Sequence, residues 1–145
     1  MIWIILIITV ILVIIIRFLI DLNKDNKDLK DQNVVEKFQI IVSKLNEYVY
    51  QGEGQIEIFD KRQLNLYKTG ENKVIQFNYS TGHLTIAWKY ASTFFKKPYI
   101  LPKQFDNVRN IDQSEEKRIA DIMIKEIEMV SLSFLKSVLD ESELK

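Results

Sequence analysis

The chain opens with a run of apolar residues over positions 2–20, which only Thr9 and Arg17 interrupt. A helix rises ~1.5 Å per residue, so this run extends ~28 Å, about the hydrocarbon thickness of a bilayer. No Lys or Arg precedes it, and no Ala or Gly occurs before Gly52 to form a cleavage site. Because a cleaved signal peptide needs both features, the pattern predicts an uncleaved signal-anchor, a single transmembrane helix over residues 1–20.

The residues around this run predict how it lies in the membrane. The membrane-anchor residues are Trp3, which can lie at the headgroup level, and Arg17, which can extend its guanidinium to the opposite interface. Lys24, Lys27 and Lys30 follow the span, whereas only the α-amino group precedes it. Since basic residues are retained on the cytoplasmic side, we expect the N-terminus outside and the soluble domain in the cytoplasm.

Residues 21–33 alternate Asp, Lys and Asn with little apolar content, and they form a polar juxtamembrane stalk. Lys24 and Asp28 stand four residues apart, as do Lys27 and Asp31, and this spacing supports a solvated helix. A disordered polar tether explains the same composition, so both interpretations stay open.

Beyond the stalk, apolar residues recur at alternating three- and four-residue steps, the period of an amphipathic helix. They are Val35, Phe38, Val42, Leu45 and Val49. Asn33 and Glu36 have the form of a capping box, and Gly52 stands where a helix end favours glycine. The same spacing occurs in two-stranded coiled coils, but barely two heptads are present. We therefore expect this helix to pack on a sheet of its own chain.

From residue 55 to 90 the period changes to two, which predicts four strands. The alternating apolar positions are Ile56, Ile58, Leu64, Leu66, Ile75, Phe77, Tyr79, Leu84, Ile86, Trp88 and Tyr90. Turn-like segments at 60–62, 69–72 and 80–82 separate them, and connections this short force antiparallel neighbours. The result is a four-stranded antiparallel meander whose apolar face needs a cover.

A second amphipathic helix completes that cover, and it starts at a capping-box-like pair, Asp112 and Glu115. Its apolar stripe comprises Ile119, Met123, Ile127, Val130, Phe134, Leu135 and Val138. Charged residues lie opposite the stripe, at Glu116, Lys117, Asp121, Lys125 and Glu128. The sequence thus predicts an α+β fold, in which a transmembrane helix precedes an α–ββββ–α domain over residues 34–145. Both helices of the domain pack on one face of the sheet.

Composition limits the chemistry that this chain can perform. Lys and Arg together number 20, and Asp and Glu together also number 20, so the formal net charge is zero. The chain therefore has no overall positive charge that would attract nucleic acid. Cys is absent and His83 is the single histidine, which excludes Cys–His catalysis and the usual zinc sites. No glycine-rich phosphate loop and no Gly-x-Ser-x-Gly motif occurs. We therefore assign no catalytic, metal or cofactor site, and an enzyme is not favoured.

One stretch departs from the overall charge balance, because residues 72–105 contain no Asp or Glu. Its second half interleaves lysines with aromatics and holds the candidate interaction surface: Lys89, Phe94, Phe95, Lys96, Lys97, Tyr99 and Lys103. Pro98 and Pro102 keep residues 97–103 extended. Such residues can contact anionic lipid headgroups or, as a weaker interpretation, stack single-stranded nucleic acid. Alternatively, the aromatics are core and edge packing, with lysines solvating the rim.

These observations favour a single-pass membrane-anchored, non-catalytic interaction module that docks a protein partner or the membrane surface. Its expected partners are the lipid bilayer and a protein of unknown identity. Nucleic acid is not expected, and the oligomeric state stays open. The alternative function is a small membrane-tethered enzyme or ligand carrier with a cleft between sheet and helices.

Overall fold

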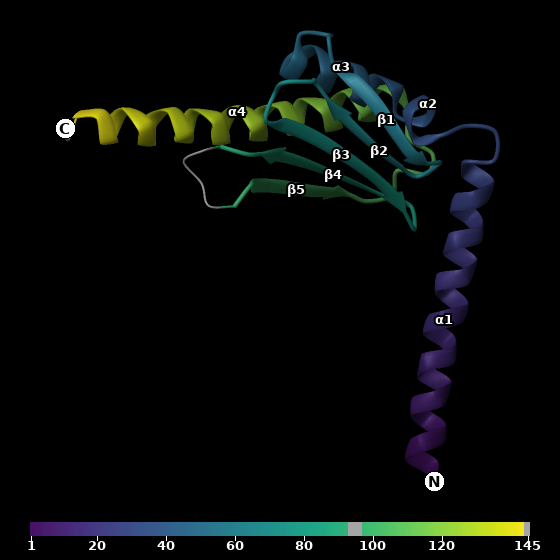
Figure 1. Cartoon of the computed structure of the whole chain (residues 1–145). Coiled ribbons are helices and arrows are strands. Elements are labelled where there is room, and N and C mark those ends of the chain that lie inside the picture. Colours follow the sequence, from purple (N-terminus) through teal and green to yellow (C-terminus); the bar gives the residue numbers. More distant parts are fainter. Residues whose placement is uncertain (93–96, 144–145) are drawn as a thin grey trace.

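The computed structural model describes residues 1–92 and 97–143, and it joins one long protruding helix to a sheet covered by further helices (Figure 1). The helices are α1 (Ile2–Asp28), α2 (Val34–Lys37), α3 (Gln39–Tyr50) and α4 (Gln113–Glu143). The strands are β1 (Gln55–Asp60), β2 (Gln63–Tyr67), β3 (Lys73–Ser80), β4 (His83–Tyr90) and β5 (Tyr99–Phe105). The α+β class that the sequence predicts is confirmed.

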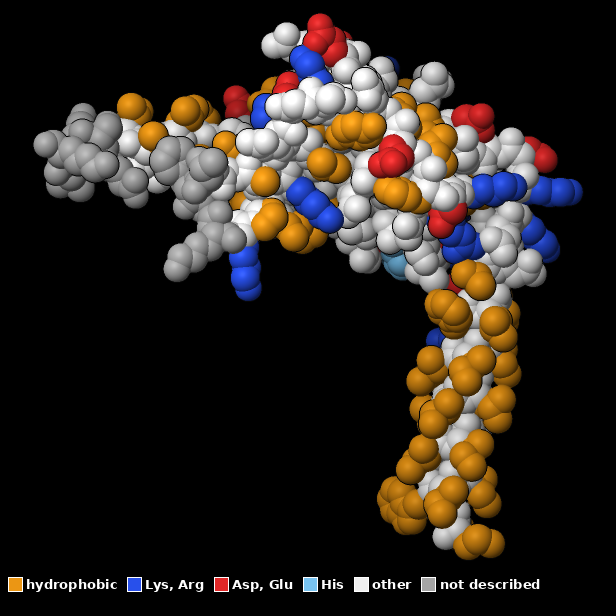
Figure 2. Space-filling model, in the orientation of Figure 1, with side chains coloured by type: hydrophobic (Ala, Val, Ile, Leu, Met, Phe, Trp, Pro, Cys, Tyr) orange, Lys and Arg blue, Asp and Glu red, His pale blue; other side chains and the backbone are white. Residues whose placement is uncertain are grey.

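Helix α1 is 27 residues long, and most of it stands clear of the rest of the molecule. Its most apolar 18-residue window has a mean hydropathy of 3.2, and none of that window is buried. By length and composition, α1 is the one helix among the described residues that could cross a membrane. Hydrophobic side chains cover it on the face that Figure 2 shows. The helix continues beyond the predicted span as far as Asp28.

The helix predicted over residues 34–50 is divided at Phe38, where φ is −114° and ψ is 36°. The capping box that begins it is complete: Glu36 N donates to Asn33 Oδ1, and Asn33 N donates to Glu36 Oε2, both at 3.0 Å. The apolar side of α2 and α3 is buried against the sheet through Val34, Phe38, Ile41, Val42 and Leu45. These helices therefore pack within their own chain.

The sheet has five strands in the order β1-β2-β3-β4-β5, each antiparallel to its neighbours. The prediction of four strands was wrong, because the extended segment after residue 97 pairs with the outer edge of β4. That pairing runs from Tyr90↔Tyr99 to Leu84↔Phe105. Pro102 lies opposite Ala87, which is tolerated because an edge strand has no partner on its outer side.

Alternation along the strands sorts their side chains onto two faces. The buried face carries Leu64, Leu66, Ile75, Phe77, Tyr79, Leu84, Ile86 and Trp88, which form one core with residues of α2, α3 and α4. The opposite face, called the uncovered face below, carries Asn65, Gln76, Asn78, Thr85 and Lys89. Only the apolar face is covered by helices, as antiparallel sheets permit.

Helix α4 covers the sheet with its N-terminal half and then runs past it (Figure 1). Ile119, Met123 and Ile127 are buried, whereas Leu135 is 61% exposed and Val138 is 45% exposed. A 31-residue helix is ~46 Å long, but a strand of eight residues spans only ~27 Å, so the predicted apolar stripe is longer than the surface it can cover.

Glu116 of α4 was expected on the solvent side but is only 7% exposed. Its Oε2 accepts a hydrogen bond from Ile40 N at 3.0 Å. The first turn of α3 has no side-chain cap of its own, so a carboxylate from α4 satisfies one of its free N–H groups.

Candidate functional site

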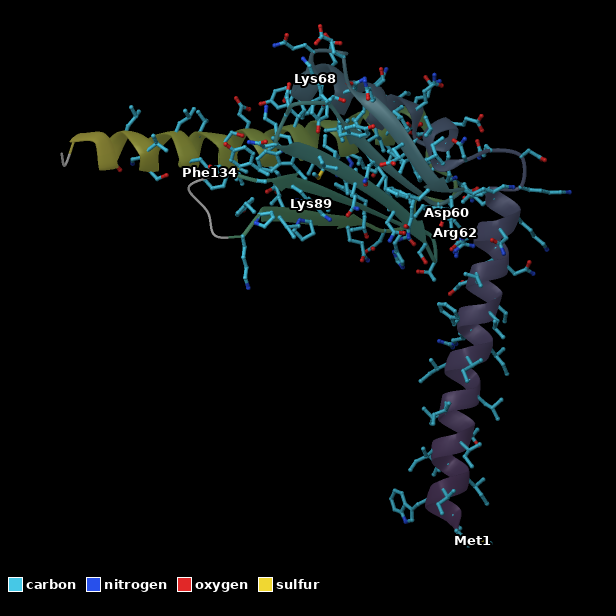
Figure 3. The ribbon with its side chains drawn as sticks, viewed as in Figure 1. Met1, Asp60, Arg62, Lys68, Lys89 and Phe134 are labelled. Atoms are coloured by element: carbon cyan, nitrogen blue, oxygen red, sulfur yellow. The ribbon has the colours of Figure 1, made fainter. Side chains whose placement is uncertain are left out.

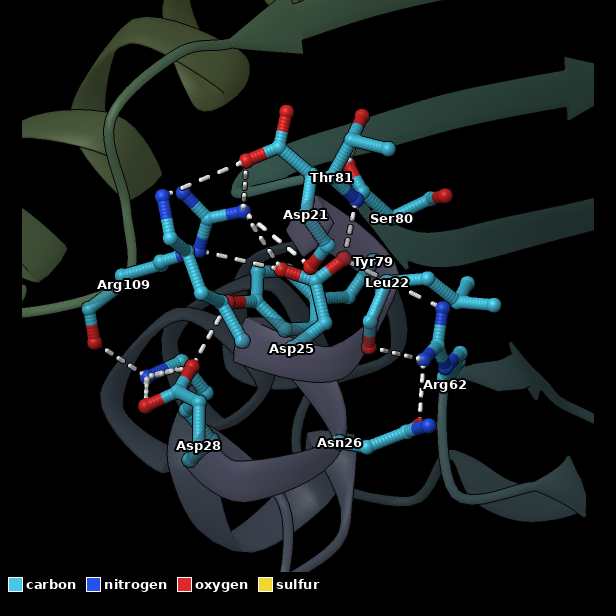
Figure 4. Close-up of polar contacts among 12 residues, drawn as sticks. Asp21, Leu22, Asp25, Asn26, Asp28, Arg62, Tyr79, Ser80, Thr81 and Arg109 are labelled. Atoms are coloured by element: carbon cyan, nitrogen blue, oxygen red, sulfur yellow. Dashed lines mark hydrogen bonds and ion pairs between the residues drawn. The ribbon is translucent and has the colours of Figure 1, made fainter. Parts of the chain in front are cut away.

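The junction between α1 and the sheet is the most elaborate polar contact in the part of the chain that the structure describes (Figure 4). Three aspartates of α1, Asp21, Asp25 and Asp28, are spaced by four and then three residues, which places them on one face of the helix. They meet basic and hydroxyl groups from four later segments of the chain. We call this set the junction cluster: Asp21, Asp25, Asp28, Lys37, Arg62, Tyr79, Thr81 and Arg109.

Asp25 is the centre of the junction cluster and is fully buried. Its Oδ1 lies 3.0 Å from an Arg109 terminal nitrogen and accepts a hydrogen bond from Arg109 Nε at 3.1 Å. Its Oδ2 accepts a hydrogen bond from Thr81 N and lies 3.9 Å from Arg62. A buried carboxylate is tolerated only when it is paired and hydrogen-bonded in this way, so α1 is fixed in one position on the sheet end.

Asp28 forms the second half of the junction cluster. Its carboxylate lies 2.8 Å from Lys37 Nζ and accepts a hydrogen bond from the Tyr79 hydroxyl at 2.6 Å. Lys37 is 5% exposed and also donates to the Arg109 carbonyl oxygen. Burial, and then the hydrogen bond to Asp28, raise the pKa of Tyr79 well above its usual value of 10.0. The tyrosine therefore stays protonated and remains a donor to Asp28.

The turns at this end of the sheet are shaped to receive α1. Thr81 adopts φ of 51° and Gly82 φ of 75°, which turns the Thr81 N–H toward Asp25. A Cβ at position 82 would lie 2.9 Å from Arg109 Cζ, so glycine leaves room for Arg109 to reach the helix. Val108 N donates to the Gly82 carbonyl at 3.0 Å and holds the Arg109 segment in place.

Backbone groups of α1 extend the junction beyond its side chains. Arg109 donates to the Asp21 carbonyl oxygen at 3.4 Å, and Arg62 donates to the Leu22 carbonyl oxygen at 3.4 Å. Arg62 also bonds the Asn26 side chain. The three carboxylates of α1 are thus matched by three cations, so the cluster joins two parts of the molecule. Among the described residues, no group of three His, Cys, Asp or Glu is arranged to hold a metal ion.

The candidate interaction surface predicted from the sequence is divided by the sheet. Phe94, Phe95 and Lys96 lie outside the described residues. Lys103 lies on the covered side, opposite Ile86, and pairs with Glu126 of α4. Lys89 is on the uncovered face (Figure 3), and Lys97 is exposed in the segment before β5. The four predicted lysines and aromatics that the structure describes therefore do not form one continuous surface.

Tyr99 belongs to a group of rings at the end of the sheet opposite the junction cluster. We call this group the aromatic cluster: Trp88, Tyr90, Tyr99 and Phe134. Trp88 and Tyr90 stack with centroids 5.8 Å apart, and Tyr99 meets Phe134 edge-on at 5.1 Å. Trp88 is buried, while the other three rings are half-buried. For these residues the structure supports the packing interpretation of the aromatic stretch.

His83 and the predicted anchor residues belong to neither cluster. His83 Nδ1 lies 2.7 Å from Asp106 Oδ1, near the start of β4. A hydrogen bond from Gln104, together with His83, lowers the pKa of the Asp106 carboxyl. Trp3 is 78% exposed near the free end of α1, and Arg17 is exposed on the same helix.

The sequence interpretation missed the junction cluster, although one signal was present. The polar composition of residues 21–33 predicts a solvated stalk, and composition alone does not indicate which helical face carries the acids. The shared helical face of Asp21, Asp25 and Asp28 is visible from their spacing alone. Their partners were not visible, because Thr81 and Arg109 lie 56 and 84 residues away from Asp25.

Comparison with known proteins gives no further assignment: no protein family, no curated protein and no solved structure matches the chain. The geometry of the junction and of the sheet is therefore the basis for a proposed function.

Proposed function

We propose that this chain is a single-pass membrane-anchored, non-catalytic interaction module, whose α+β domain is held in one orientation at the membrane surface. In this proposal α1 spans the bilayer through residues 2–20, with the N-terminus outside and the domain in the cytoplasm. Arg17 and the lysines after the span favour that direction.

The observation that carries the proposal is the burial of Asp25 on the same continuous helix as the apolar span. A flexible tether would let the domain turn freely above the membrane. Here the helix leaves the apolar run and enters the junction cluster without a break, so its direction fixes the direction of the sheet. A module of this kind presents one chosen surface to the bilayer and the others to partners.

The orientation can be measured by double electron–electron resonance on the full chain in nanodiscs. Because the chain has no Cys, nitroxide labels can be attached to cysteines placed at Leu12 in the span and at the exposed Asn78 on the sheet. We expect a narrow distance distribution between the two labels. Asp25→Ala should broaden it, because the two arginines lose their shared carboxylate.

Asp31→Ala is the matched control, since Asp31 is exposed three residues beyond α1 and should leave the distribution narrow. A broad distribution in the unaltered chain would contradict a fixed orientation. Membrane spanning is tested separately: the protein should resist extraction by alkaline carbonate. In sealed cells, external protease should leave the domain intact, and cleavage would reverse the proposed direction.

A further inference from the structure

The junction cluster determines how closely the domain approaches a membrane, and this argument rests on the proposed function. Asp21 follows directly after the span, and its carbonyl oxygen already accepts a hydrogen bond from Arg109. Ile20 and Asp25 are five residues apart, or ~7.5 Å along a helix. The headgroup layer on one side of a bilayer is ~5–7 Å thick, so the domain begins where the headgroups end.

One side of the sheet faces the membrane in this arrangement. In Figure 1, β5 is the strand nearest to the N-terminal end of α1, and it runs roughly perpendicular to that helix. Helix α4 lies on the other side of β4 and β5. The uncovered face of these two strands is therefore turned toward the side on which the bilayer would lie.

The residues there suit a layer of anionic headgroups. We call the following set the β5 surface: Lys89, Ile100 and Pro102 on the uncovered face, together with Lys97, which is exposed in the segment just before β5. Lys89 lies opposite Ile100 in the β4–β5 pairing, on the uncovered face, and Figure 3 shows Lys89 beside these strands. Ile100 is 50% exposed, and neither Lys89 nor Lys97 has an acidic partner among the described residues. Basic side chains attract anionic headgroups, and an apolar side chain beside them can enter the membrane interface.

The opposite edge of the sheet has the contrary charge. Strand β1 is exposed along its whole length, with Ile56 at 43%, Ile58 at 49% and Phe59 at 58%, but it carries Glu57 and Asp60 and has no basic residue. Anionic headgroups would repel it. The β1 edge is thus the more apolar of the two, but only the edge nearer to the free end of α1 is basic, so charge and not apolar content distinguishes the β5 surface.

We propose that the β5 surface rests on the anionic headgroup layer of the membrane that α1 spans. Lys89 and Lys97 contact the lipid phosphates, and Ile100 enters the interface between them. The domain then lies against the bilayer, and β1 points away from it toward the aqueous phase.

Nitroxide accessibility tests this contact on the full chain, reconstituted in vesicles of phosphatidylcholine and phosphatidylglycerol. Single labels are placed at Ile100→Cys and at Ile58→Cys, a matched pair of isoleucines with nearly equal exposure on opposite edges. We expect a water-soluble nickel complex to relax the label at position 100 several-fold less than the label at position 58. In pure phosphatidylcholine that difference should shrink, because the phosphate contacts lose the net negative charge of the surface.

Charge reversal sharpens the same test. Lys97→Glu should raise the nickel accessibility of the label at position 100, whereas Lys136→Glu on the exposed part of α4 should not. Equal accessibility at positions 100 and 58 overturns the proposal. If the protection of position 100 depends on the ratio of protein to lipid, the surface contacts a second copy of the chain. That result also overturns the proposal.

A third label separates this proposal from the one on which it depends. A nitroxide at Leu12→Cys lies in the middle of the span and should be shielded from nickel. If the Leu12 label is shielded while the labels at positions 100 and 58 are equally accessible to nickel, the proposed membrane span is supported and the proposed β5 contact is wrong. If the Leu12 label is open to nickel, the membrane anchor itself is wrong, and the β5 contact fails with it.

Discussion

At the end of the sheet next to α1 the contacts join charged groups, whereas at the opposite end they join aromatic rings. The junction cluster pairs Asp25 and Asp28 with Lys37, Arg62 and Arg109 at distances of 2.8–3.9 Å. The aromatic cluster holds its rings at centroid distances of 5.1–6.3 Å. The two ends therefore differ in how strictly their geometry is specified.

A buried charge tolerates few arrangements, because each oxygen needs a donor at hydrogen-bonding distance. Ring contacts and buried apolar area vary more gradually with position. The charged contacts hold α1 at one end of the sheet, whereas the ring contacts at the other end hold α4 against β4 and β5. On this basis we expect the junction cluster to determine the direction of α1 relative to the sheet more strictly than the aromatic cluster determines the position of α4.

The strongest test of this comparison removes the central carboxylate. Asp25→Ala should lower the free energy of unfolding of the domain by about 3 kcal/mol, since it removes the buried carboxylate that Arg62 and Arg109 share. Arg109 would keep only the more exposed Asp21, at 3.5 Å. Urea denaturation of the full chain in detergent micelles, followed by near-ultraviolet circular dichroism, measures the change. Asp31→Ala should stay within about 0.5 kcal/mol of the unaltered chain. A small loss for Asp25→Ala would mean that water satisfies the arginines.

The second test acts on the aromatic end. Phe134→Ala removes a half-buried ring that contacts Tyr90 and Tyr99, and it should cost about 2 kcal/mol by the same measurement. Leu135→Ala, at the adjacent 61% exposed position, should change little. The comparison predicts that Phe134→Ala keeps the label distance between positions 12 and 78 narrow although the domain is weaker. Broadening in this variant would break the distinction between the two ends.

The parts of the molecule that follow from local pattern could be predicted from the sequence. The apolar helix, the capping box at Asn33 and the meander through Tyr90 each depend on residues within a few positions of one another. Strand β5 escaped prediction because Pro102 and Lys103 interrupt its alternation, which only an edge position tolerates. The junction cluster could not be predicted because its aspartates lie in a polar segment typical of solvent-exposed residues. Their arginine partners come from turns that are distant in the sequence.

A smaller difference between the two ends of the sheet is expected when a single tyrosine hydroxyl group is removed at each end. Tyr79→Phe keeps the ring but removes the donor to Asp28, and it should cost about 1.5 kcal/mol, the range for a hydrogen bond to a charged group. Tyr90→Phe is the matched substitution at the aromatic end, where the ring contacts Trp88 and Phe134. It should be nearly neutral. Equal costs for the two variants would show that the Asp28 hydrogen bond contributes no more than the ring.

The smallest effect is a dependence on alkaline pH. The pKa of Tyr79 is raised in the folded protein, first by burial and then by Asp28, so the unfolded chain loses this proton at lower pH than the folded one. The stabilising contribution is complete below the unfolded value of 10.0 and is lost as pH rises above it. By about pH 11 the unfolding free energy should have fallen by about 1 kcal/mol from this group. Burial also raises the pKa of Tyr50, so this tyrosine adds a similar loss of stability at high pH.

Urea denaturation at several pH values measures this effect. The free energy of unfolding should fall less steeply with pH in Tyr79→Phe than in the unaltered chain. Parallel curves would mean that Tyr79 ionises without opening the junction, and the donor to Asp28 would then not be needed to hold α1.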